Sequence, residues 1–458
     1  MAGSAMADGP GEAKWPVVGD AAMKHAMASI GAVIVCVGSV VQAGAALAES
    51  HLKAAVAKVD ITPPPGTPVV GHVRPVEGVR DPLRAVLLFL DDGRTRVAMV
   101  TLDLLSAERE MTDQLREAIA AAAAVPADQI LVAASHNHSG PGWRDHPAYS
   151  RKVVQEVAEA ARQAAARMVP VSVGYAEDQI DFNINRRQMI GGRSVVRLNP
   201  DGPCDRRVKV LRIDEEGKED PLAVVMHAVC HPCVFTWGDR WSPPYPLGYP
   251  KVSADFPGEA KAFVERAYAG QTTALFLQGC CGDIRPNLPG FPYRCGDEAV
   301  IRWTGRGLGC AAVRAADRAA IREQRARRPT FFPIRAATSR VLLPAAKGEG
   351  TVECELQALK IGPYLLLTLP GEPMVEYGFR LEREIGPRAV PIVVGYSNGN
   401  LGYICTDQAF QEGGYEPNHA QAGPGSEQRL IAELLKLADR VIGDVFESFA
   451  PVRTQGGK

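Results

Sequence analysis

The feature that most constrains this chain is a series of short apolar runs, each followed by side chains that can bind a metal or transfer a proton. Apolar runs of about four to eight residues are typical of buried strands. Because strands that alternate with helices build α/β domains, we expect a single α/β domain with a mixed β-sheet core flanked by helices. The polar residues that follow the runs are Asp103, His136 with His138, His231, Asp283, Glu372, and Asn398 with Tyr403.

These strand-end residues also predict where a functional site lies. Ligands of α/β proteins bind at the carboxyl ends of strands, so side chains that follow parallel neighbouring strands meet at one edge of the sheet. A single polar strand end has no functional meaning, since every strand must end. A series that includes two histidine-bearing motifs favours a site at the C-terminal ends of the strands.

Helices are expected where apolar residues recur every three or four positions. These segments are residues 112–124, 149–168, 259–268, 311–324 and 427–449. The expected strands are residues 84–90, 96–101, 130–134, 208–213, 222–229, 274–277, 364–369 and 390–394. Two long segments rich in proline and aromatic residues, 235–250 and 286–293, are expected to be functional loops or lids.

The charge balance argues against one large class of partners. The chain has 51 basic and 52 acidic residues, which leave a formal net charge of −1. A nucleic-acid-binding surface needs a basic excess or stripe, so we expect a small-molecule or lipid substrate instead. No later segment of the sequence is long and apolar enough to form a transmembrane span, and no feature indicates the oligomeric state.

The N-terminal segment has the features of a secretory signal peptide. It begins with a basic stretch at Met23, continues through an apolar run at residues 28–41, and ends in a small-x-small cleavage site at Ala48. Residues 1–22 precede the basic start and are interpreted as an upstream extension. We therefore expect residues 1–48 to be absent from a mature catalytic domain of residues 49–458, which would be periplasmic or secreted.

His136 and His138 form a His-x-His pair just after a predicted strand. Neutral imidazole is the commonest protein ligand for zinc, and a catalytic zinc site uses three or four N, O or S ligands and keeps a position for water. The residues alone make His136, His231 and Glu372 the best ligand set. Because bound zinc acidifies water and polarises a carbonyl group, such a site suits amide or ester hydrolysis.

The segment Cys230-His231-Pro232-Cys233 offers a rival interpretation as a thiol redox centre. Such centres normally open a helix whose N-terminus stabilises the thiolate. Here an aromatic stretch and two prolines follow, which predict a loop, so the redox interpretation ranks below the metal site. The two cysteines could also hold a structural zinc ion, but the sequence has no second cysteine pair at matching spacing.

At these motifs the chain resembles the neutral, non-lysosomal ceramidases, in their N-terminal catalytic domain. The resemblance runs from Val59 to about Tyr415, and its most specific piece is the stretch from His136 to Gly142, similar to the family signature His-x-His-Ser-Gly-Pro-Gly. The other matching pieces are Asn185-Arg186, residues 228–231, residues 253–255, residues 282–287, Pro370-Gly371-Glu372 and Gly402-Tyr403.

The resemblance implies roles for individual residues. The family's zinc ligands would fall on His136, His231, Glu372 and Tyr403. Its catalytic groups that polarise the substrate and transfer protons would fall on His138, Arg186 and Tyr415. The implied activity is a zinc-dependent amidohydrolase that splits a ceramide-like N-acyl amide into a fatty acid and an amine, a step of sphingolipid metabolism.

One departure from the family pattern bears on the substrate. Where family members have a serine in Gly-Asp-x-Ser-Pro-Asn, this chain has Arg285, two residues after Asp283. Both residues are expected to contact the substrate. A long cation there would either close the pocket to a neutral two-chain lipid or bind a carboxylate or phosphate. The alternatives are therefore a zinc hydrolase of another ester or anionic amide, or a non-catalytic binding protein with the same fold.

Overall fold

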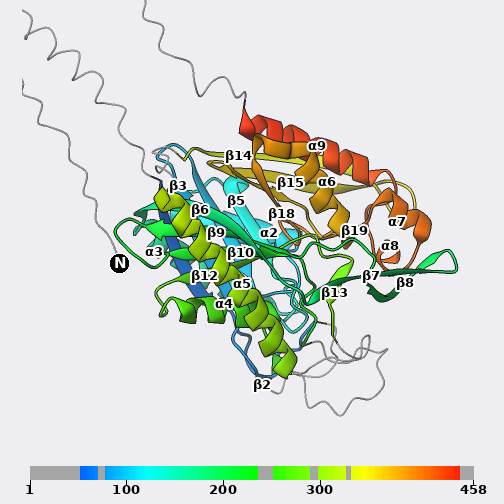
Figure 1. The fold of residues 1–458 in the computed structure, drawn as a ribbon, viewed down its shortest axis with the longest axis horizontal. Helices are drawn as coiled ribbons and strands as arrows, with labels where there is room; N and C mark the ends of the chain where they lie inside the picture. Colours follow the sequence, from blue (N-terminus) through cyan, green and yellow to red (C-terminus); the bar gives the residue numbers. More distant parts are fainter. Residues whose placement is uncertain (1–51, 71–77, 236–250, 289–297, 326–331, 444–458) are drawn as a thin grey trace, which may run out of the picture. The chain divides into compact units, whose positions relative to one another are not determined.

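The structure is a computed structural model that describes residues 52–70, 78–235, 251–288, 298–325 and 332–443 (Figure 1). Within these ranges the largest sheet has eight strands in the order β12-β10-β9-β6-β1-β3-β4-β5. Its strands are β1 (Lys53–Asp60), β3 (Arg84–Asp91), β4 (Arg96–Leu102), β5 (Ile130–Ala134), β6 (Val169–Gln179), β9 (Arg207–Glu215), β10 (Ala223–Ala228) and β12 (Thr273–Gln278). Both parallel and antiparallel pairs occur in it, which confirms the predicted mixed sheet.

A second sheet of four strands packs on the first through a shared apolar layer. It consists of β14 (Ile334–Pro344), β15 (Thr351–Ile361), β16 (Tyr364–Thr368) and β18 (Val390–Val394). Smaller sheets join β13 (Ile284–Pro286) to β7 (Asn183–Ile190) and β8 (Arg193–Asn199), β17 (Glu372–Pro373) to β19 (Tyr403–Ile404), and β2 (Gly78–Val79) to β11 (Lys251–Val252).

Helices cover the outer faces of both sheets (Figure 1). The eight-stranded sheet is covered by α2 (Arg109–Ala123), α3 (Pro147–Ala165), α4 (Asp255–Ala267) and α5 (Glu298–Arg325). The four-stranded sheet is covered by α6 (Val375–Ile385) and α9 (Ser426–Ile442). Two short helices, α7 (Asp407–Glu412) and α8 (Tyr415–Asn418), follow β19. The flanking helices confirm the α/β fold class.

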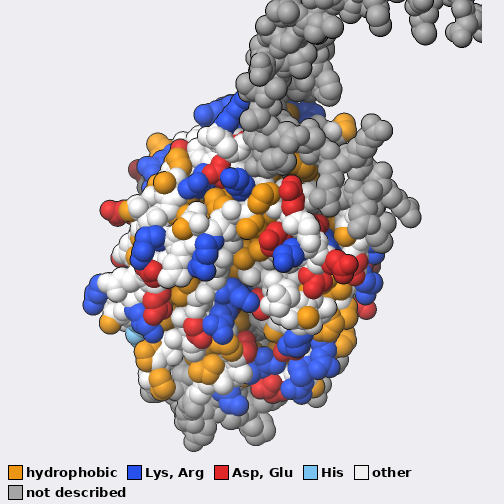
Figure 2. Space-filling view, turned by 90° about the vertical axis from the view of Figure 1, so that its left-hand side faces the viewer, with side chains coloured by type: hydrophobic (Ala, Val, Ile, Leu, Met, Phe, Trp, Pro, Cys, Tyr) orange, Lys and Arg blue, Asp and Glu red, His pale blue; other side chains and the backbone are white. Residues whose placement is uncertain are grey.

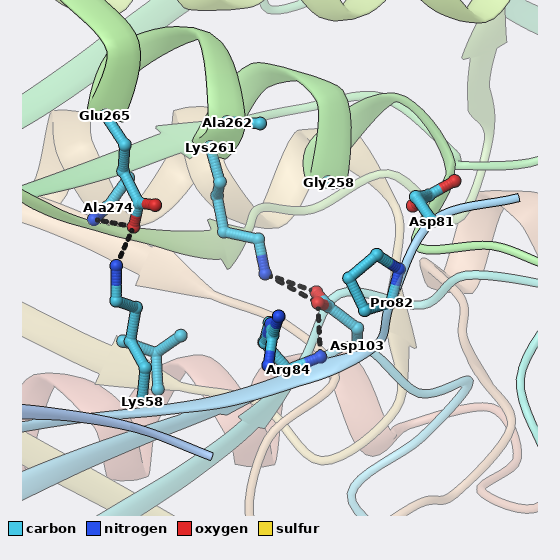
Figure 3. A pocket seen from close by; sticks show the side chains of 11 residues that line it. Lys58, Asp81, Pro82, Arg84, Asp103, Gly258, Lys261, Ala262, Glu265 and Ala274 are labelled. Carbon is cyan, nitrogen blue, oxygen red and sulfur yellow. Dashed lines mark hydrogen bonds and ion pairs between the residues drawn. The ribbon is translucent and has the colours of Figure 1, made fainter. Parts of the chain in front are cut away.

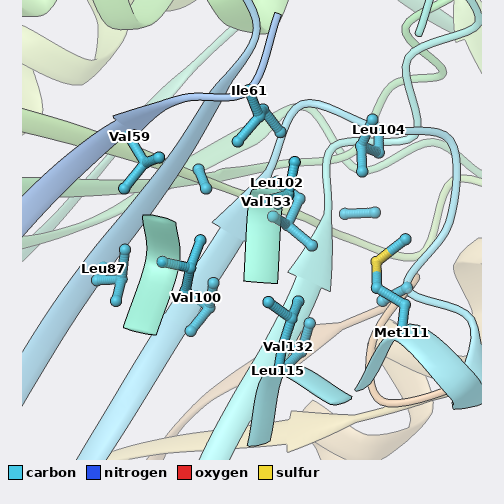
Figure 4. Packing of buried hydrophobic residues seen from close by; sticks show 14 of the residues in the cluster. Val59, Ile61, Leu87, Val100, Leu102, Leu104, Met111, Leu115, Val132 and Val153 are labelled. Carbon is cyan, nitrogen blue, oxygen red and sulfur yellow. The ribbon is translucent and has the colours of Figure 1, made fainter. Parts of the chain in front are cut away.

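The core under α2 and α3 shows why these segments fold as they do (Figure 4). Alternate residues of a strand face the same side, so Leu87 and Val100 both point toward the helices. Met111 and Leu115 lie one turn apart on α2 and belong to the same buried cluster, with Leu115 beside Val132 of β5 (Figure 4). Each such side chain contributes about 1.5–3 kcal/mol when it is fully buried.

On the face shown in Figure 2, basic, acidic and apolar side chains are interspersed. This mixture agrees with the balanced composition and with the absence of a basic stripe on the face in view. None of the described helices combines the length and the apolar character needed to cross a membrane. The predicted signal peptide and most of the predicted loop at 235–250 lie outside the described residues, so the export and the domain boundary at 48–49 stay predictions.

The carboxyl ends of several strands are joined by backbone hydrogen bonds. The amide of Ala134, at the end of β5, donates to the carbonyl of Tyr396 at 2.9 Å. Next to it, the amide of Gly395 donates to Gln278, the last residue of β12, also at 2.9 Å. Residues after β5, β12 and β18 therefore share one edge, as the strand-end pattern predicts.

Candidate metal centre

Three polar side chains from distant parts of the chain meet at this edge. The Nε2 atoms of His136 and His231 are 2.9 Å apart. Oε2 of Glu372 lies 3.3 Å from Nε2 of His136 and 3.5 Å from Nε2 of His231. Both histidines are buried, and Glu372 is largely buried. The structure thus brings together the ligand set that the residues alone favoured.

Both histidine rings are oriented by backbone carbonyls. Nδ1 of His136 donates to the carbonyl of Leu105 at 2.7 Å, and Nδ1 of His231 donates to that of Cys281 at 2.9 Å. A neutral imidazole that donates from Nδ1 carries its lone pair on Nε2, and metal-binding histidines are usually held in this way. Burial lowers the pKa of His231 well below its ordinary value, which keeps this ring neutral.

The side-chain atoms of this cluster are suited to bind a cation. Two ring lone pairs and a carboxylate oxygen face one another, and like acceptors at this distance repel unless a positive charge lies between them. Oε2 of Glu372 is buried and has no hydrogen-bond partner among the described residues. Burial acts to raise the pKa of Glu372, but interactions with its neighbours, His136 first and then Arg186, outweigh it and lower the pKa. A metal ion would supply the missing positive charge.

His138 extends the group. His136, His138 and His231 offer ring nitrogens within 4.8 Å of one another, a set that could hold a metal ion. Burial, followed by the charge of His136, lowers the pKa of His138 to about 3. Its Nε2 is buried without a hydrogen-bond partner in the described part of the chain. The structure therefore places His138 beside the cluster as a neutral imidazole.

Left-handed backbone conformations shape this edge. His136 has a φ of 67°, and Tyr396, whose ring centroid lies 4.2 Å from that of His136, has a φ of 53°. Residues other than glycine seldom adopt this region, and when they do they often lie at functional sites. Tyr396 carries no signal in the sequence that would connect it to the histidines, and sequence reasoning missed it.

Glu372 and Tyr403 are placed side by side by a short parallel pairing. They lie opposite each other in the ladder of β17 and β19. The preceding glycines allow this close approach, since a Cβ on Gly371 would lie 2.4 Å from the carbonyl oxygen of Gly402. Both glycines also have positive φ, 140° and 65°. Tyr403, the fourth ligand implied by the resemblance, is therefore next to Glu372.

Arg186 is held beside Tyr403 by two hydrogen bonds. Its Nη2 donates to Oη of Tyr403 at 3.0 Å, and its Nε donates to Oε1 of Glu416 at 3.0 Å. Burial alone would lower the pKa of Arg186, but Tyr403 and Glu416 raise it, so the guanidinium stays charged. The rings of Tyr403 and Tyr415 each lie within 6 Å of its central carbon, at 5.5 and 5.7 Å. Sequence reasoning missed Glu416, a lone acidic residue on the short helix α8.

The two residues predicted to contact substrate have different surroundings. Asp283 is buried, and its carboxylate accepts from Nδ2 of Asn185 at 2.7 Å and from the amide of Val375 at 2.9 Å. Burial and the charge of Glu376 raise the pKa of Asp283 to about 8. Arg285 lies on β13, and its charge contributes to the low pKa of His138. Their substrate contacts stay predictions.

The cysteines do not support a redox centre. Cys230 and Cys233 are both free thiols, and residues 229–233 form no helix. Burial raises the pKa of both thiols, whereas a reactive thiol needs a lowered one.

Behind the histidine turn lies a buried ion pair that sequence reasoning did not find (Figure 3). Nζ of Lys261, from α4, donates to both carboxylate oxygens of Asp103 at 2.5 and 2.7 Å. These two residues line a cavity of about 360 Å³ that the three histidines do not line. The carbonyls of the next residues, Leu104 and Leu105, accept from the amide and Nδ1 of His136. The ion pair therefore anchors the segment that orients His136, and Asp103 itself does not reach the cluster.

Comparison with known proteins supports the fold. The chain is similar to neutral ceramidase from Pseudomonas aeruginosa, with a TM-score of 0.70 and 17% identity over 85% of this chain and 74% of that one. It is also similar to a ceramidase in complex with C2, with a TM-score of 0.69 and 17% identity over 85% of this chain and 75% of that one. No model of a known protein family matches the sequence, and no curated protein matches it either. At this identity the likeness establishes a ceramidase-like fold.

Proposed function

We propose that this protein is a zinc-dependent hydrolase that cleaves an N-acyl amide, with a ceramide-like lipid as the leading substrate. The observation that carries the proposal is the cluster of His136, His231 and Glu372, whose side-chain acceptors face one another and, for Oε2 of Glu372, have no hydrogen-bond partner among the described residues. The ceramidase-like fold supports the same substrate class. In this proposal Tyr403 completes the ligand set.

The bound ion would polarise the amide carbonyl and make water acidic enough to act as a nucleophile near neutral pH. Arg186 stays charged and is fixed by Tyr403 and Glu416, so it can stabilise the negative charge that develops on the carbonyl oxygen. Tyr415, whose ring lies 5.7 Å from that of Tyr403, can donate to the same oxygen from its hydroxyl group.

His138 is assigned the proton transfer. In this role, which the resemblance implies, its imidazole would take a proton from the attacking water and pass it to the departing nitrogen. The amide C–N bond breaks, the carbonyl carbon keeps the water oxygen, and the products are a carboxylic acid and an amine. Asp283 is assigned a positioning role, since its carboxylate holds Asn185, the residue before Arg186.

A second candidate substrate class follows from Arg285. Arg285 follows Ile284, whose carbonyl accepts from the amide of His231 at 3.2 Å, so it is placed near the cluster, where its charge can attract an anionic group on the substrate. An anionic amide or ester is therefore the alternative to a neutral ceramide. Hydrolysis of both kinds of substrate by the wild type and by Arg285→Ser separates them: Arg285→Ser should favour the neutral amide if Arg285 excludes it, and no change would remove Arg285 from the selection.

The test begins with the metal content of the purified protein and its hydrolysis of a fluorogenic N-acyl-sphingosine before and after chelation. Stoichiometric zinc and chelator-sensitive cleavage are expected. His136→Ala should lose both, whereas the matched control His146→Ala, at the start of α3 and outside the cluster, should keep both. Full cleavage by metal-free protein would overturn the proposal, and zinc without cleavage of any amide or ester would favour a binding protein.

A further inference from the structure

A β-hairpin next to the candidate site exposes an unusual set of apolar side chains. Met189 and Ile190 of β7 and Val196 of β8 are 48%, 46% and 36% exposed. Tyr415, on the adjacent helix α8, is 46% exposed. The other large apolar residues with comparable exposure in the described ranges are Val79, Trp303 and Leu342. Most of the exposed large apolar side chains in the described ranges therefore lie together, near Arg186.

The tip of this hairpin stands in open space. β7 and β8 are joined by Gly191 and Gly192, with φ angles of 60° and 79°. Two successive positive φ angles are typical of the type I′ turn, which makes a tight and well-defined hairpin. A Cβ placed on either glycine would meet nothing within 4 Å. Figure 1 shows the hairpin extending away from the two main sheets.

Apolar side chains occur on both faces of the hairpin. Met189 lies opposite Ser194, which puts it on one face together with Val196. Ile190 lies opposite Arg193, on the other face. A protein surface that docked on one face would leave the other in water. An apolar medium that surrounds the tip would cover both, so the arrangement favours insertion over docking.

The charge of the hairpin identifies the surface. Residues 183–199 contain no acidic residue. Arg187 is buried and paired with Glu412 and Glu416, whereas Arg193 and Arg197 are exposed. Exposed cations that flank an apolar tip are the combination with which peripheral proteins bind anionic lipid, the tip entering the boundary and the cations meeting the head groups.

We propose that the β7–β8 hairpin inserts its tip into the surface of an anionic lipid layer and holds the candidate site against it. The strand that carries Met189 and Ile190 also carries Arg186, so insertion would place the residues around Tyr403 and Tyr415 next to the layer. This goes beyond the proposed hydrolysis, because the lipid surface is a partner and need not contain the substrate.

The test uses the full chain and sedimentation with sucrose-loaded vesicles that contain no cleavable amide. One set is phosphatidylcholine alone, and the other contains one quarter phosphatidylglycerol. We expect binding to the anionic set that falls with added salt. The double variant Met189→Ser/Ile190→Ser should bind at least 10-fold less, and Arg193→Ser/Arg197→Ser should lose the preference for anionic vesicles.

The matched control is Trp303→Ser/Leu342→Ser, which removes equally exposed apolar side chains elsewhere. It should bind like the wild type. Absence of binding by the wild type, or an equal loss in the control, would overturn the proposal, as would a wild-type dimer that Met189→Ser/Ile190→Ser dissociates, since that assigns the hairpin to a second copy. Circular dichroism checks that each variant is folded. Vesicle binding without any hydrolysis would refute the proposed activity and leave this inference standing.

Discussion

Two buried polar clusters are connected to the turn that carries His136, and they differ in one respect. In the first, Lys261 donates to both oxygens of Asp103, so donor meets acceptor. In the second, His136, His231 and Glu372 turn three acceptors toward one another. The first cluster is complete within the chain, and in our proposal a bound cation completes the second.

The difference shows that burial alone does not tell a structural polar cluster from one that can bind a ligand. Both clusters are buried and both contain a carboxylate, but only Glu372 has a buried carboxylate oxygen without a hydrogen-bond partner among the described residues. A complete ion pair fixes local structure, and its removal is felt mainly in stability. Buried acceptors that face one another without a cation destabilise the metal-free protein. A bound cation would remove this destabilisation. The two clusters should therefore respond differently to mutation.

The largest expected effect is that of His231→Ala. It removes one of the acceptors, so metal affinity should fall by more than the roughly 100-fold typical of a change outside the ligand shell, and hydrolysis should fall to background. Zinc at about 100 times its Kd should stabilise the wild type by about 2.7 kcal/mol and the variant by less than about 0.4 kcal/mol. Calorimetric unfolding with and without zinc measures this, and equal stabilisation of both proteins would break the comparison.

Lys261→Met should lower the stability of the protein even when no metal is present. It leaves the Asp103 carboxylate buried without its partner, which typically costs about 3–5 kcal/mol of unfolding free energy. Urea unfolding without metal measures the loss. The double variant Asp103→Leu/Lys261→Met should recover part of it, because no unpaired charge is then buried. A stable Lys261→Met protein would show that the ion pair does not anchor the segment behind His136.

Arg186→Lys sharpens the comparison, because Arg186 has hydrogen-bond partners in Glu416 and Tyr403, and Tyr403 lies opposite Glu372 of the candidate metal cluster. A lysine cannot reach Tyr403 and Glu416 together, and loss of one group that stabilises a developing oxyanion typically lowers kcat by about 10²–10³-fold. The metal content should stay unchanged. Steady-state kinetics and metal analysis on the same sample separate the two results, and a parallel loss of zinc would instead make Arg186 a support for the ligands.

The smallest expected effect concerns Asp255, at the start of α4. Its carboxylate accepts from the amides of Phe235 and Phe256. Burial is the largest influence and raises the pKa of Asp255 to about 6 from an ordinary value of 3.8. A raised pKa gives stability that is fully present below about pH 4 and is lost as the pH rises through about 6.

Relative to Asp255→Asn, the wild type should therefore lose about 2–3 kcal/mol of unfolding free energy between pH 4 and 7. Asparagine tolerates the positive φ of 54° at this position, so the variant is a fair reference. Urea unfolding at several pH values measures the difference. A constant difference across the range would contradict a raised pKa.

The strands that bury both faces were the easiest to predict. The apolar runs at 364–369 and 390–394 became β16 (Tyr364–Thr368) and β18 (Val390–Val394). Sequence reasoning missed β14, which is half-exposed along most of its length, and β15, whose buried stretch is interrupted by the polar residues Glu355 and Gln357. It missed β7 because four of the five buried residues at its start are polar, and β8 because it is largely exposed. The predicted closing helix at 427–449 agrees with α9 as far as Ile442, and residues 444–449 lie outside the described ranges.

The histidines and Glu372 could be predicted because their side-chain chemistry is visible in the sequence. The carbonyls of Leu105 and Cys281, which orient the rings, could not, since every residue has a carbonyl. Lys261 was hidden for another reason: on an amphipathic helix, a lysine is expected to face water. The roles of His138, Arg186, Tyr403 and Tyr415 came from the resemblance alone and stay proposals.

The ladder that places Glu372 opposite Tyr403 has a consequence for the synthesis of the protein. The histidine turn leaves the ribosome long before residues 402–404, which must pair with residues 371–373 before Glu372 has its place. Contacts between segments that are distant in the sequence form slowly, so His136 and His231 are made before Glu372 can take its place beside them. The complete metal centre would therefore form late in folding, and zinc binding would occur only after residues 402–404 have paired with residues 371–373.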